Sequence, residues 1–361
     1  MKKLISLILC CTLVLALAGC AGTTVVVGDC TCPPEAHEPV AAPTEAPVAA
    51  TEAPAAPAAT GLKTGLAIVP SLGKSAAATA EANGKADFDV TVVAVTVDAN
   101  GVIESCVIDS VGASAEFTAQ GAPVAAGAAE VKSKNELGFD YGMVAYKASP
   151  IGKEWFEQAD ALATFAEGKT VEQVKAAITN GYASDVDLAT SATIYLGGYV
   201  GAMEEAVANA KELGAASGDE LKLAVTATLT SAEAEVGGTA ELVLDAAALT
   251  LAGETVTSAT IDSLQAKVAF DAAGAITSDL TAKTKNQLGF DYGMVAYKAS
   301  GIGKEWFEQT AYFCEYITGK TLTEIATISV DEGTKPADVD LATGCTIAIG
   351  GFQGLIAKVA G

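Results

Sequence analysis

An internal repeat constrains the fold of this chain more than any other feature of its sequence. Four segments occur twice in the same order: Leu137–Ser149 with Leu288–Ser300, Ile151–Gln158 with Ile302–Gln309, Gly168–Thr170 with Gly319–Thr321, and Asp187–Thr190 with Asp340–Thr343. Self-similarity over such a long period indicates one structural unit present in two copies. We therefore predict two tandem domains, at residues 62–213 and 219–361, joined by the short segment 214–218. The chain has 361 residues, half of them hydrophobic, which is enough for two domains that each bury a core.

Within each copy, strand patterns come before helical ones. Residues 88–97 alternate loosely and are rich in Val and Thr, and a turn at 98–101 leads into a second such run at 102–108. This pattern predicts a β-hairpin. The second copy has a corresponding stretch at 240–261, with weaker turn signals between its strands.

Helical patterns fill the rest of each copy. A helix is predicted over residues 153–166, with one apolar core stripe formed by Trp155, Ala159, Leu162 and Phe165. Capping boxes begin at Thr170 and Thr321, and last helices are predicted over 194–210 and 347–359. Strands that are segregated from helices indicate an α+β fold, built from antiparallel strands plus helices, rather than a doubly wound sheet.

The N-terminus has the organisation of an export signal. Lys2 and Lys3 precede an apolar run at 4–18, which is shorter than the roughly 20 residues that span a bilayer. The run ends in Leu-Ala-Gly-Cys at 17–20, which resembles the lipobox of bacterial lipoproteins. The resemblance implies a signal peptide at 1–19, diacylation of the Cys20 thiol, and an anchor in the cell membrane that faces the extracellular or cell-wall side. The alternative is ordinary secretion with a chance cysteine.

Residues 20–61 are predicted to form a stalk. Pro, Ala, Glu and Thr dominate positions 33–60, and no apolar periodicity appears there. Such a composition favours an extended, polyproline-like chain. At about 3.1 Å per residue, the stalk reaches on the order of 120 Å, which suits a domain held through a cell-wall layer.

Residue types that carry hydrolytic, metal or nucleic-acid chemistry are scarce. His37 is the single histidine, so Ser-His-Asp and Cys-His catalytic sites are excluded. Cys30 and Cys32 could bind a metal or form a strained bridge, but no second pair completes a tetrahedral site, and no metal is expected. The chain contains no arginine and carries a net charge of −23, which excludes the basic surface that binds nucleic acid.

The segment Asp187–Thr193 carries the candidate chemistry. It places an acid, a hydroxyl, two small residues and a second hydroxyl directly before an expected helix, and the segment Asp340–Thr346 repeats this order. Both segments resemble the flavinylation motif of the FMN-binding domain family. In that family the last Thr or Ser takes FMN through a phosphoester bond, which a dedicated flavin transferase makes.

The resemblance implies a role for each position and two covalent FMN groups in the chain. In the first copy the matching residues are Asp187 as the acid, Thr190 as the first hydroxyl, Ser191 and Ala192 as the small pair, and Thr193 as the acceptor. In the second copy they are Asp340, Thr343, Gly344 and the acceptor Thr346, whereas Cys345 departs from the usual Ala.

A phosphate on Thr193 is chemically reasonable at the start of a helix. Free amides and the positive end of the helix dipole would face it there, and a covalent ester needs no arginine clamp. The alternative is that Asp187, Thr190 and Thr193 are simply N-cap and first-turn residues, where these types are favoured anyway. The repeated tyrosines Tyr141 and Tyr146, with their copies Tyr292 and Tyr297, could line a pocket, but packing in turns and strands is favoured.

The layout of anchor, stalk and two repeats resembles the lipoproteins of extracellular electron transfer in Gram-positive bacteria. The resemblance implies electrons that arrive from a membrane quinone or NADH dehydrogenase system and leave to extracellular acceptors such as ferric iron. An electron carrier is favoured over a flavin-dependent reductase, because no dinucleotide fingerprint such as G-x-G-x-x-G accompanies the repeats. The remaining alternative is a non-enzymatic surface lipoprotein that binds a solute, a wall polymer or a protein partner.

Overall fold

The structure is a computed structural model that describes residues 61–360, all of which belong to one compact unit. The predicted signal peptide, Cys20, the stalk, His37 and the pair Cys30 and Cys32 lie outside the described residues. No helix within 61–360 has the length and apolar character needed to cross a membrane.

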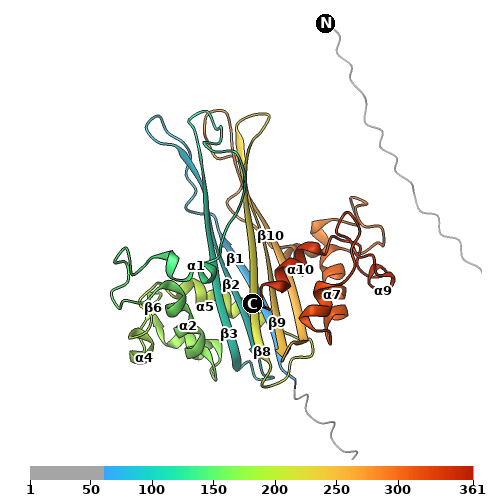
Figure 1. The fold of residues 1–361 in the computed structure, drawn as a ribbon. Helices are drawn as coiled ribbons and strands as arrows, with labels where there is room; N and C mark the ends of the chain where they lie inside the picture. The colour runs from blue at the N-terminus through green and yellow to red at the C-terminus, as the bar shows by residue number, and fades with distance from the viewer. Residues whose placement is uncertain (1–60, 361) are drawn as a thin grey trace, which may run out of the picture. The chain divides into compact units, whose positions relative to one another are not determined.

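Two four-stranded antiparallel sheets form the centre of this unit (Figure 1). The first has the order β3-β2-β1-β7, and its strands are β1 (Lys63–Ser71), β2 (Gly84–Val97), β3 (Ile103–Phe117) and β7 (Lys211–Glu212). The second has the order β10-β9-β8-β4, and its strands are β8 (Glu220–Glu233), β9 (Gly238–Ala252), β10 (Thr255–Phe270) and β4 (Gly127–Glu130). The predicted β-hairpin is confirmed as β2 and β3, and β9 with β10 is its counterpart. Strands β1 and β8 were not predicted.

Each sheet carries its own set of helices. In the first copy these are α1 (Lys134–Leu137), η1 (Gly138–Tyr141), α2 (Trp155–Ala166), α3 (Val171–Ala176), α4 (Val186–Ala189) and α5 (Gly197–Ala208), with a small hairpin of β5 (Ile178–Thr179) and β6 (Tyr182–Ala183). In the second copy they are α6 (Lys285–Leu288), η2 (Gly289–Tyr292), α7 (Trp306–Ile317), α8 (Leu322–Ala326), α9 (Val339–Ala342) and α10 (Gly350–Ala357). The α+β class and both predicted capping boxes are confirmed.

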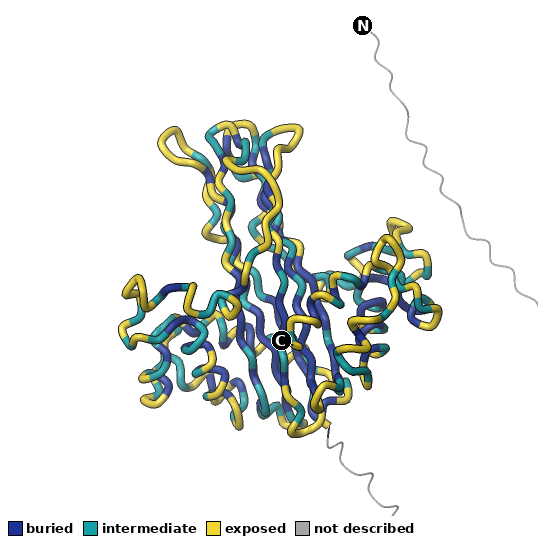
Figure 2. The backbone as a smooth tube through the Cα atoms, viewed as in Figure 1, coloured by how far each residue is buried: buried dark blue, intermediate teal, exposed yellow. Residues whose placement is uncertain are grey.

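The two copies share one apolar core, and here the structure differs from the expectation of two domains with separate cores. Side chains from both sheets, such as Phe88 and Leu242, meet in a central cluster. Each sheet also forms one further cluster with its own helices. Figure 2 shows the strands buried along the middle of the unit. The reason is that the helices of a copy cover one face of its sheet, and the other face would remain in water without the second copy.

The linker between the copies is part of the fold. Residues 211–212 pair with the start of β1, and the amide of Leu62 donates to the carbonyl of Ala215 at 2.9 Å. Ala215 is buried. Residues 211–215 therefore run along the start of β1 at the edge of the first sheet.

A buried aspartate sits at the same place in each copy, beside the short helix that follows the hairpin. Asp262 on β10 accepts hydrogen bonds from the amides of Ser263 (2.7 Å) and Asn286 (3.0 Å). Burial nevertheless raises the pKa of Asp262 to about 6, against 3.8 for an ordinary aspartate. Burial also raises the pKa of Asp109, its counterpart on β3.

The substitution Asp262→Asn should flatten the pH dependence of stability. The native Asp262 binds its proton more tightly than the unfolded chain does, so the unfolding free energy falls as pH rises from about 4 to about 6. The shift corresponds to about 3 kcal/mol. The amide side chain of the variant stays neutral at every pH, so its unfolding free energy should not show this fall. Urea unfolding of parent and variant at a series of pH values should therefore show the parent losing unfolding free energy relative to the variant across that window. Curves that keep a constant separation from pH 4 to 7 would contradict the assignment.

Candidate functional site

The first turn of α2 holds the loop that follows η1. The buried carboxylate of Glu154, at the N-cap, accepts hydrogen bonds from the amides of Met143 (2.7 Å) and Val144 (2.9 Å). The amide of Glu154 in turn donates to the carboxylate of Glu157 at 2.7 Å. Glu154 is only 2% exposed, so these bonds are shielded from water. Glu154 therefore fixes the position of the loop at residues 143–144, which forms one wall of the candidate site.

One turn further along α2, Gln158 holds the opposite wall. Its side-chain oxygen accepts hydrogen bonds from the amide of Thr193 (2.8 Å), the hydroxyl of Thr193 (3.2 Å) and the amide of Ile194 (3.2 Å). Its side-chain nitrogen donates to the carbonyl of Lys153 at 3.0 Å, which fixes the orientation of the amide group. Gln158 is fully buried. The predicted acceptor Thr193 is thus held by both its backbone and its hydroxyl.

The second copy repeats this arrangement. Glu305 accepts from the amides of Met294 (2.8 Å) and Val295 (2.9 Å). Gln309 accepts from the amide of Thr346 (2.8 Å) and from its hydroxyl (3.0 Å). These contacts explain why the helix start Glu-Trp-Phe-Glu-Gln is identical in both copies, because its acid and its amide each hold one wall.

A slot lies between the two walls. In the second copy it has a volume of about 410 Å³ and is lined by Tyr292, Gly293, Met294, Tyr297, Ala299, Trp306 and Ile347. Ile347 directly follows the predicted acceptor Thr346. Gly293 has a positive φ of 81°, and a Cβ there would lie 2.8 Å from the ring of Tyr297. Only glycine lets that ring lie over the backbone at the edge of the slot.

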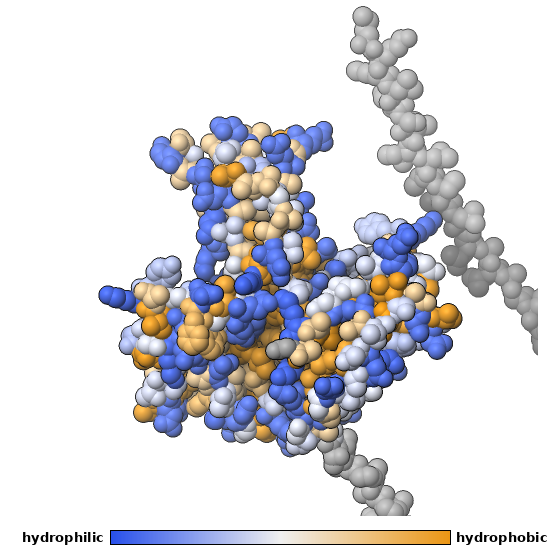
Figure 3. All heavy atoms as spheres, viewed as in Figure 1, coloured by the Kyte–Doolittle hydropathy of each residue, from blue (hydrophilic) through white to orange (hydrophobic). Residues whose placement is uncertain are grey.

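Apolar side chains are exposed at corresponding positions of the two copies. Tyr146 and Tyr297 are 84% and 83% exposed, which corrects the expectation that these tyrosines pack in turns and strands. Figure 3 shows hydrophobic residues at the surface over the helices of both copies. The repeated exposed positions are Phe139 with Phe290, Val144 with Val295, Tyr146 with Tyr297, and Val186 with Val339. The two copies thus expose apolar side chains at the same four positions.

A lysine lies over two aromatic rings in each copy. The ammonium of Lys285 is 4.9 Å from the ring of Trp306 and 5.4 Å from that of Tyr292. Lys134 makes the same two contacts in the first copy. Burial lowers the pKa of both lysines. Trp306 and its counterpart are buried as the helical stripe predicts.

The other motif residues of the first copy surround α4. Asp185 caps this helix through the amides of residues 187 and 188, so Asp187 lies in the first turn and is exposed. The Thr190 hydroxyl donates to the carbonyl of Asp187 at 2.8 Å. Ser191 is half-buried and Ala192 is buried against the helices. Asp187 and Thr190 thus act as helix-end residues rather than as partners of the Thr193 hydroxyl, which bonds to Gln158 instead.

The structure corrects the expected position of the acceptor at a helix start. Helix α5 begins at Gly197 rather than near Ile194, and α10 begins at Gly350. The amides of Thr193 and Ile194 are not free, because Gln158 bonds both of them. The amides of Leu196 and Gly197 both donate to the carbonyl of residue 181, which turns the chain before the helix can begin. A phosphate on Thr193 would therefore find no free backbone amide at residues 193 and 194.

Copy two differs from copy one beneath the motif. A Cβ on Gly344 would lie 2.4 Å from the ring of Tyr312, whose hydroxyl is 3.2 Å from that of Thr343 and from the carbonyl oxygen of Asp340. Cys345 is buried, and burial raises the pKa of its thiol to about 11. The neutral thiol fills the place of Ala192, and the hold on Thr346 is unchanged.

Sequence reasoning missed Glu154, Gln158 and their copies Glu305 and Gln309. The signal was present, since all four lie in the unchanged segment Ile151–Gln158 and its copy Ile302–Gln309. No group of three or more His, Cys, Asp or Glu side chains within 61–360 has the arrangement of a metal site. Comparison with protein-family models, curated proteins and solved structures returned no match.

Proposed function

We propose that the chain is an electron carrier with FMN covalently attached to Thr193 and Thr346. The observation that carries this proposal is that a buried glutamine holds a threonine hydroxyl in both copies, and that in the second copy the next residue, Ile347, lines an aromatic slot. The hydroxyl donates its proton to the glutamine oxygen, so its own oxygen lone pairs remain available for a bond to phosphorus.

The residues present fit a flavin. The aromatic and thioether side chains of the slot, Tyr292, Tyr297, Trp306 and Met294, match a flat apolar ring. A flavin in this slot would cover the exposed ring of Tyr297. Lys285 places a positive charge behind the aromatic rings. That charge would favour a negative charge on a flavin ring bound in the slot. A bound flavin supplies the capacity to take up and release electrons.

The attachment is a phosphoryl transfer that this chain does not perform by itself. A dedicated flavin transferase would form the bond from the threonine oxygen to the phosphorus of FMN, while the hydroxyl proton and the other half of an activated FMN donor leave. The fold contributes a fixed hydroxyl. The remainder of the proposal follows the sequence: a Cys20 lipid anchor, donation from a membrane quinone or NADH dehydrogenase system, and delivery to extracellular acceptors such as ferric iron.

Co-expression of the full chain with a flavin transferase tests the proposal. The purified protein should be yellow, and its flavin fluorescence should stay with the polypeptide after acid denaturation and gel electrophoresis. Flavin that separates from the denatured chain, or a colourless protein from cells with a demonstrably active transferase, would overturn the proposal. The same chain made without the transferase is the control.

A further inference from the structure

The two copies meet at two corresponding junctions, because β3 lies beside β8 and β1 lies beside β10. At the junction of β3 and β8, Lys358 at the end of α10 reaches across to the first copy. Its ammonium donates to the carboxylate of Glu136 at 2.6 Å and to the carbonyl of Val225 at 2.9 Å. The lysine and Glu136 are each about one-third exposed or less. An alkylammonium therefore fills this junction.

The register of the sheets identifies the matching positions at the other junction. Asp109 and Asp262 make the same contacts in their copies, and the strand rows through them are Ile68–Val92–Asp109 and Val225–Ala246–Asp262. Ile68 is therefore the counterpart of Val225. Gln287 corresponds to Glu136, because each is the third residue of its short helix after the capping hydroxyl.

Glu205 takes the place of Lys358 at this second junction. Each residue stands at the same distance from the first glycine of its helix, Gly197 in α5 and Gly350 in α10. The side-chain amide of Gln287 donates to Glu205 at 2.6 Å, which is the counterpart of the bond between Lys358 and its glutamate. The second junction thus repeats the contact between helices but has no ammonium at this position among its described residues.

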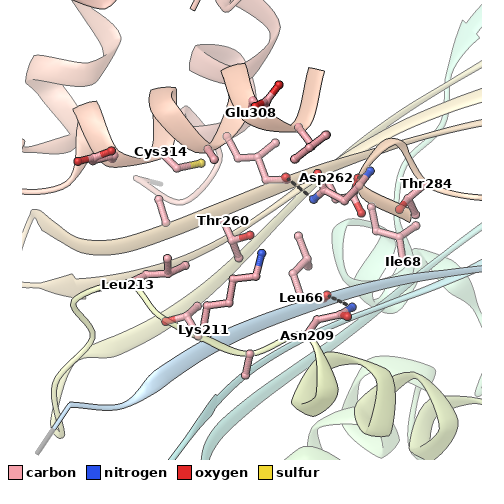
Figure 4. A pocket seen from close by; sticks show the side chains of 18 of the residues that line it. Leu66, Ile68, Asn209, Lys211, Leu213, Thr260, Asp262, Thr284, Glu308 and Cys314 are labelled. Atoms are coloured by element: carbon pink, nitrogen blue, oxygen red, sulfur yellow. Dashed lines mark hydrogen bonds between the residues drawn. The ribbon is translucent and has the colours of Figure 1, made fainter. Parts of the chain in front are cut away.

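A cavity lies where that ammonium would be. Its volume is about 930 Å³, and it is lined by Ile68, Glu205, Asp262 and Gln287 among others. Figure 4 shows it between the helix that carries Glu308 and the strands that carry Leu66, Ile68 and Asp262. Leu66 and Ile68 form the apolar part of its floor, beside Thr64 and Thr260. The backbone carbonyl that Val225 offers to Lys358 at the first junction belongs here to Ile68.

The charge of the lining favours a cation. Five acids line the cavity, and they are Glu205, Glu212, Asp262, Glu308 and Glu315. Two lysines oppose them, Lys211 and Lys304, and the ammonium of Lys304 lies 5.0 Å from the ring of Tyr312. The acids lie around an apolar floor, which suits a ligand with an aliphatic chain between separated positive charges.

We infer that this cavity binds an aliphatic polyamine. The lysine side chain that fills the twin junction is an aminobutyl group, and an aminobutyl arm is also the end of spermidine. In this assignment one ammonium takes the Lys358-like position between the carboxylate of Glu205 and the carbonyl of Ile68. The aliphatic chain lies over the apolar floor, and the other ammonium groups face the acids of the rim.

The double variant E205K/Q287E tests the inference by building the missing pair into the cavity. The introduced lysine and glutamate reproduce the residues Lys358 and Glu136 of the twin junction, so the chain supplies its own ammonium. Spermidine titrated into the full chain at low salt, followed by calorimetry, should bind with one site per chain. In the double variant its affinity should fall by about tenfold or more, the loss expected for a displaced charge-assisted contact.

Two further variants keep the result decisive. E205Q removes one carboxylate without adding a side chain to the cavity, and it should weaken spermidine binding even if the double variant folds poorly. E235Q changes the net charge by the same single unit as the double variant, but Glu235 is exposed at the β8–β9 turn, away from the cavity lining. The affinity of the E235Q chain for spermidine should therefore match that of the parent. Absence of a one-site isotherm would overturn the inference, because the cavity would then hold no spermidine. Equal affinity of spermidine for all four chains would also overturn it, because binding would then depend only on the net charge of the protein.

Discussion

The variant with both Thr193 and Thr346 replaced by Ala is expected to carry no covalent flavin. Each replacement removes the oxygen that would bond to phosphorus, and the glutamine would hold no other hydroxyl in its place. The amides of residues 193 and 346 keep their bonds to Gln158 and Gln309, so the fold should be preserved. Absorbance of the denatured protein near the flavin bands measures the result, and it should fall to the background of the chain made without transferase.

Single variants assign the two sites separately. T193A and T346A should each lose about half of the flavin, since the contacts of the acceptor are the same in both copies. T190A removes a nearby hydroxyl that bonds to a carbonyl of its own helix, and it should keep full loading. If flavin persists in the double Ala variant, the acceptor assignment is wrong, and if T190A is the variant that loses it, the motif has been aligned incorrectly.

Replacing Glu154 by Ala is the second change with a large expected effect. It removes two short bonds between a buried carboxylate and the amides of Met143 and Val144, and the cost should be about 3 kcal/mol of unfolding free energy. The loop that forms one wall of the slot would also lose its position. We therefore expect flavin loading of the first copy to fall while the second copy keeps its own.

The chain provides its own control for this variant. E167A changes the charge by the same amount at an exposed position at the other end of α2, and it should change neither stability nor loading. E305A should instead lower the flavin loading of the second copy, because Glu305 makes the corresponding bonds there. Urea unfolding and the flavin content of each half measure both effects. An E154A chain with parental stability and full loading of Thr193 would contradict the role given to this glutamate.

Local features of the fold followed from the sequence because local rules determine them. The capping residues Thr170 and Thr321 begin helices as predicted, and the turn after β2 forms around Asp98, which accepts from the amide of Val102. Helix α5 was predicted to begin three residues early, since its apolar pattern continues into the turn held by Gln158. Periodicity alone does not reveal such a side-chain contact.

The packing of one copy on the other depends on contacts that are distant in sequence. A signal for it existed in β9, where Ala246–Leu251 is apolar at almost every position. Such a run indicates a strand that is buried on both faces, as the structure shows for its second half. A sheet covered by helices on one side and by a second sheet on the other needs this pattern. Two separate domains would show strict alternation instead.

The candidate site was predicted in part for a similar reason. The motif predicted Thr193 and Thr346 as the acceptors, whereas Gln158 was missed because a polar residue on a helix is usually placed on the solvent side. Its fully buried side chain satisfies five neighbouring polar groups, so it is stable inside the protein only together with Thr193 and its loop. The exact repeat of this residue was the evidence that its position matters.

The intact mass of the acid-denatured chain, purified from membranes of its native cell, tests the central claim most directly. The account predicts the lipidated polypeptide plus two additions, each equal to FMN less one water, and peptide sequencing that places them on Thr193 and Thr346. A chain that carries its lipid but no flavin mass on either threonine would contradict it.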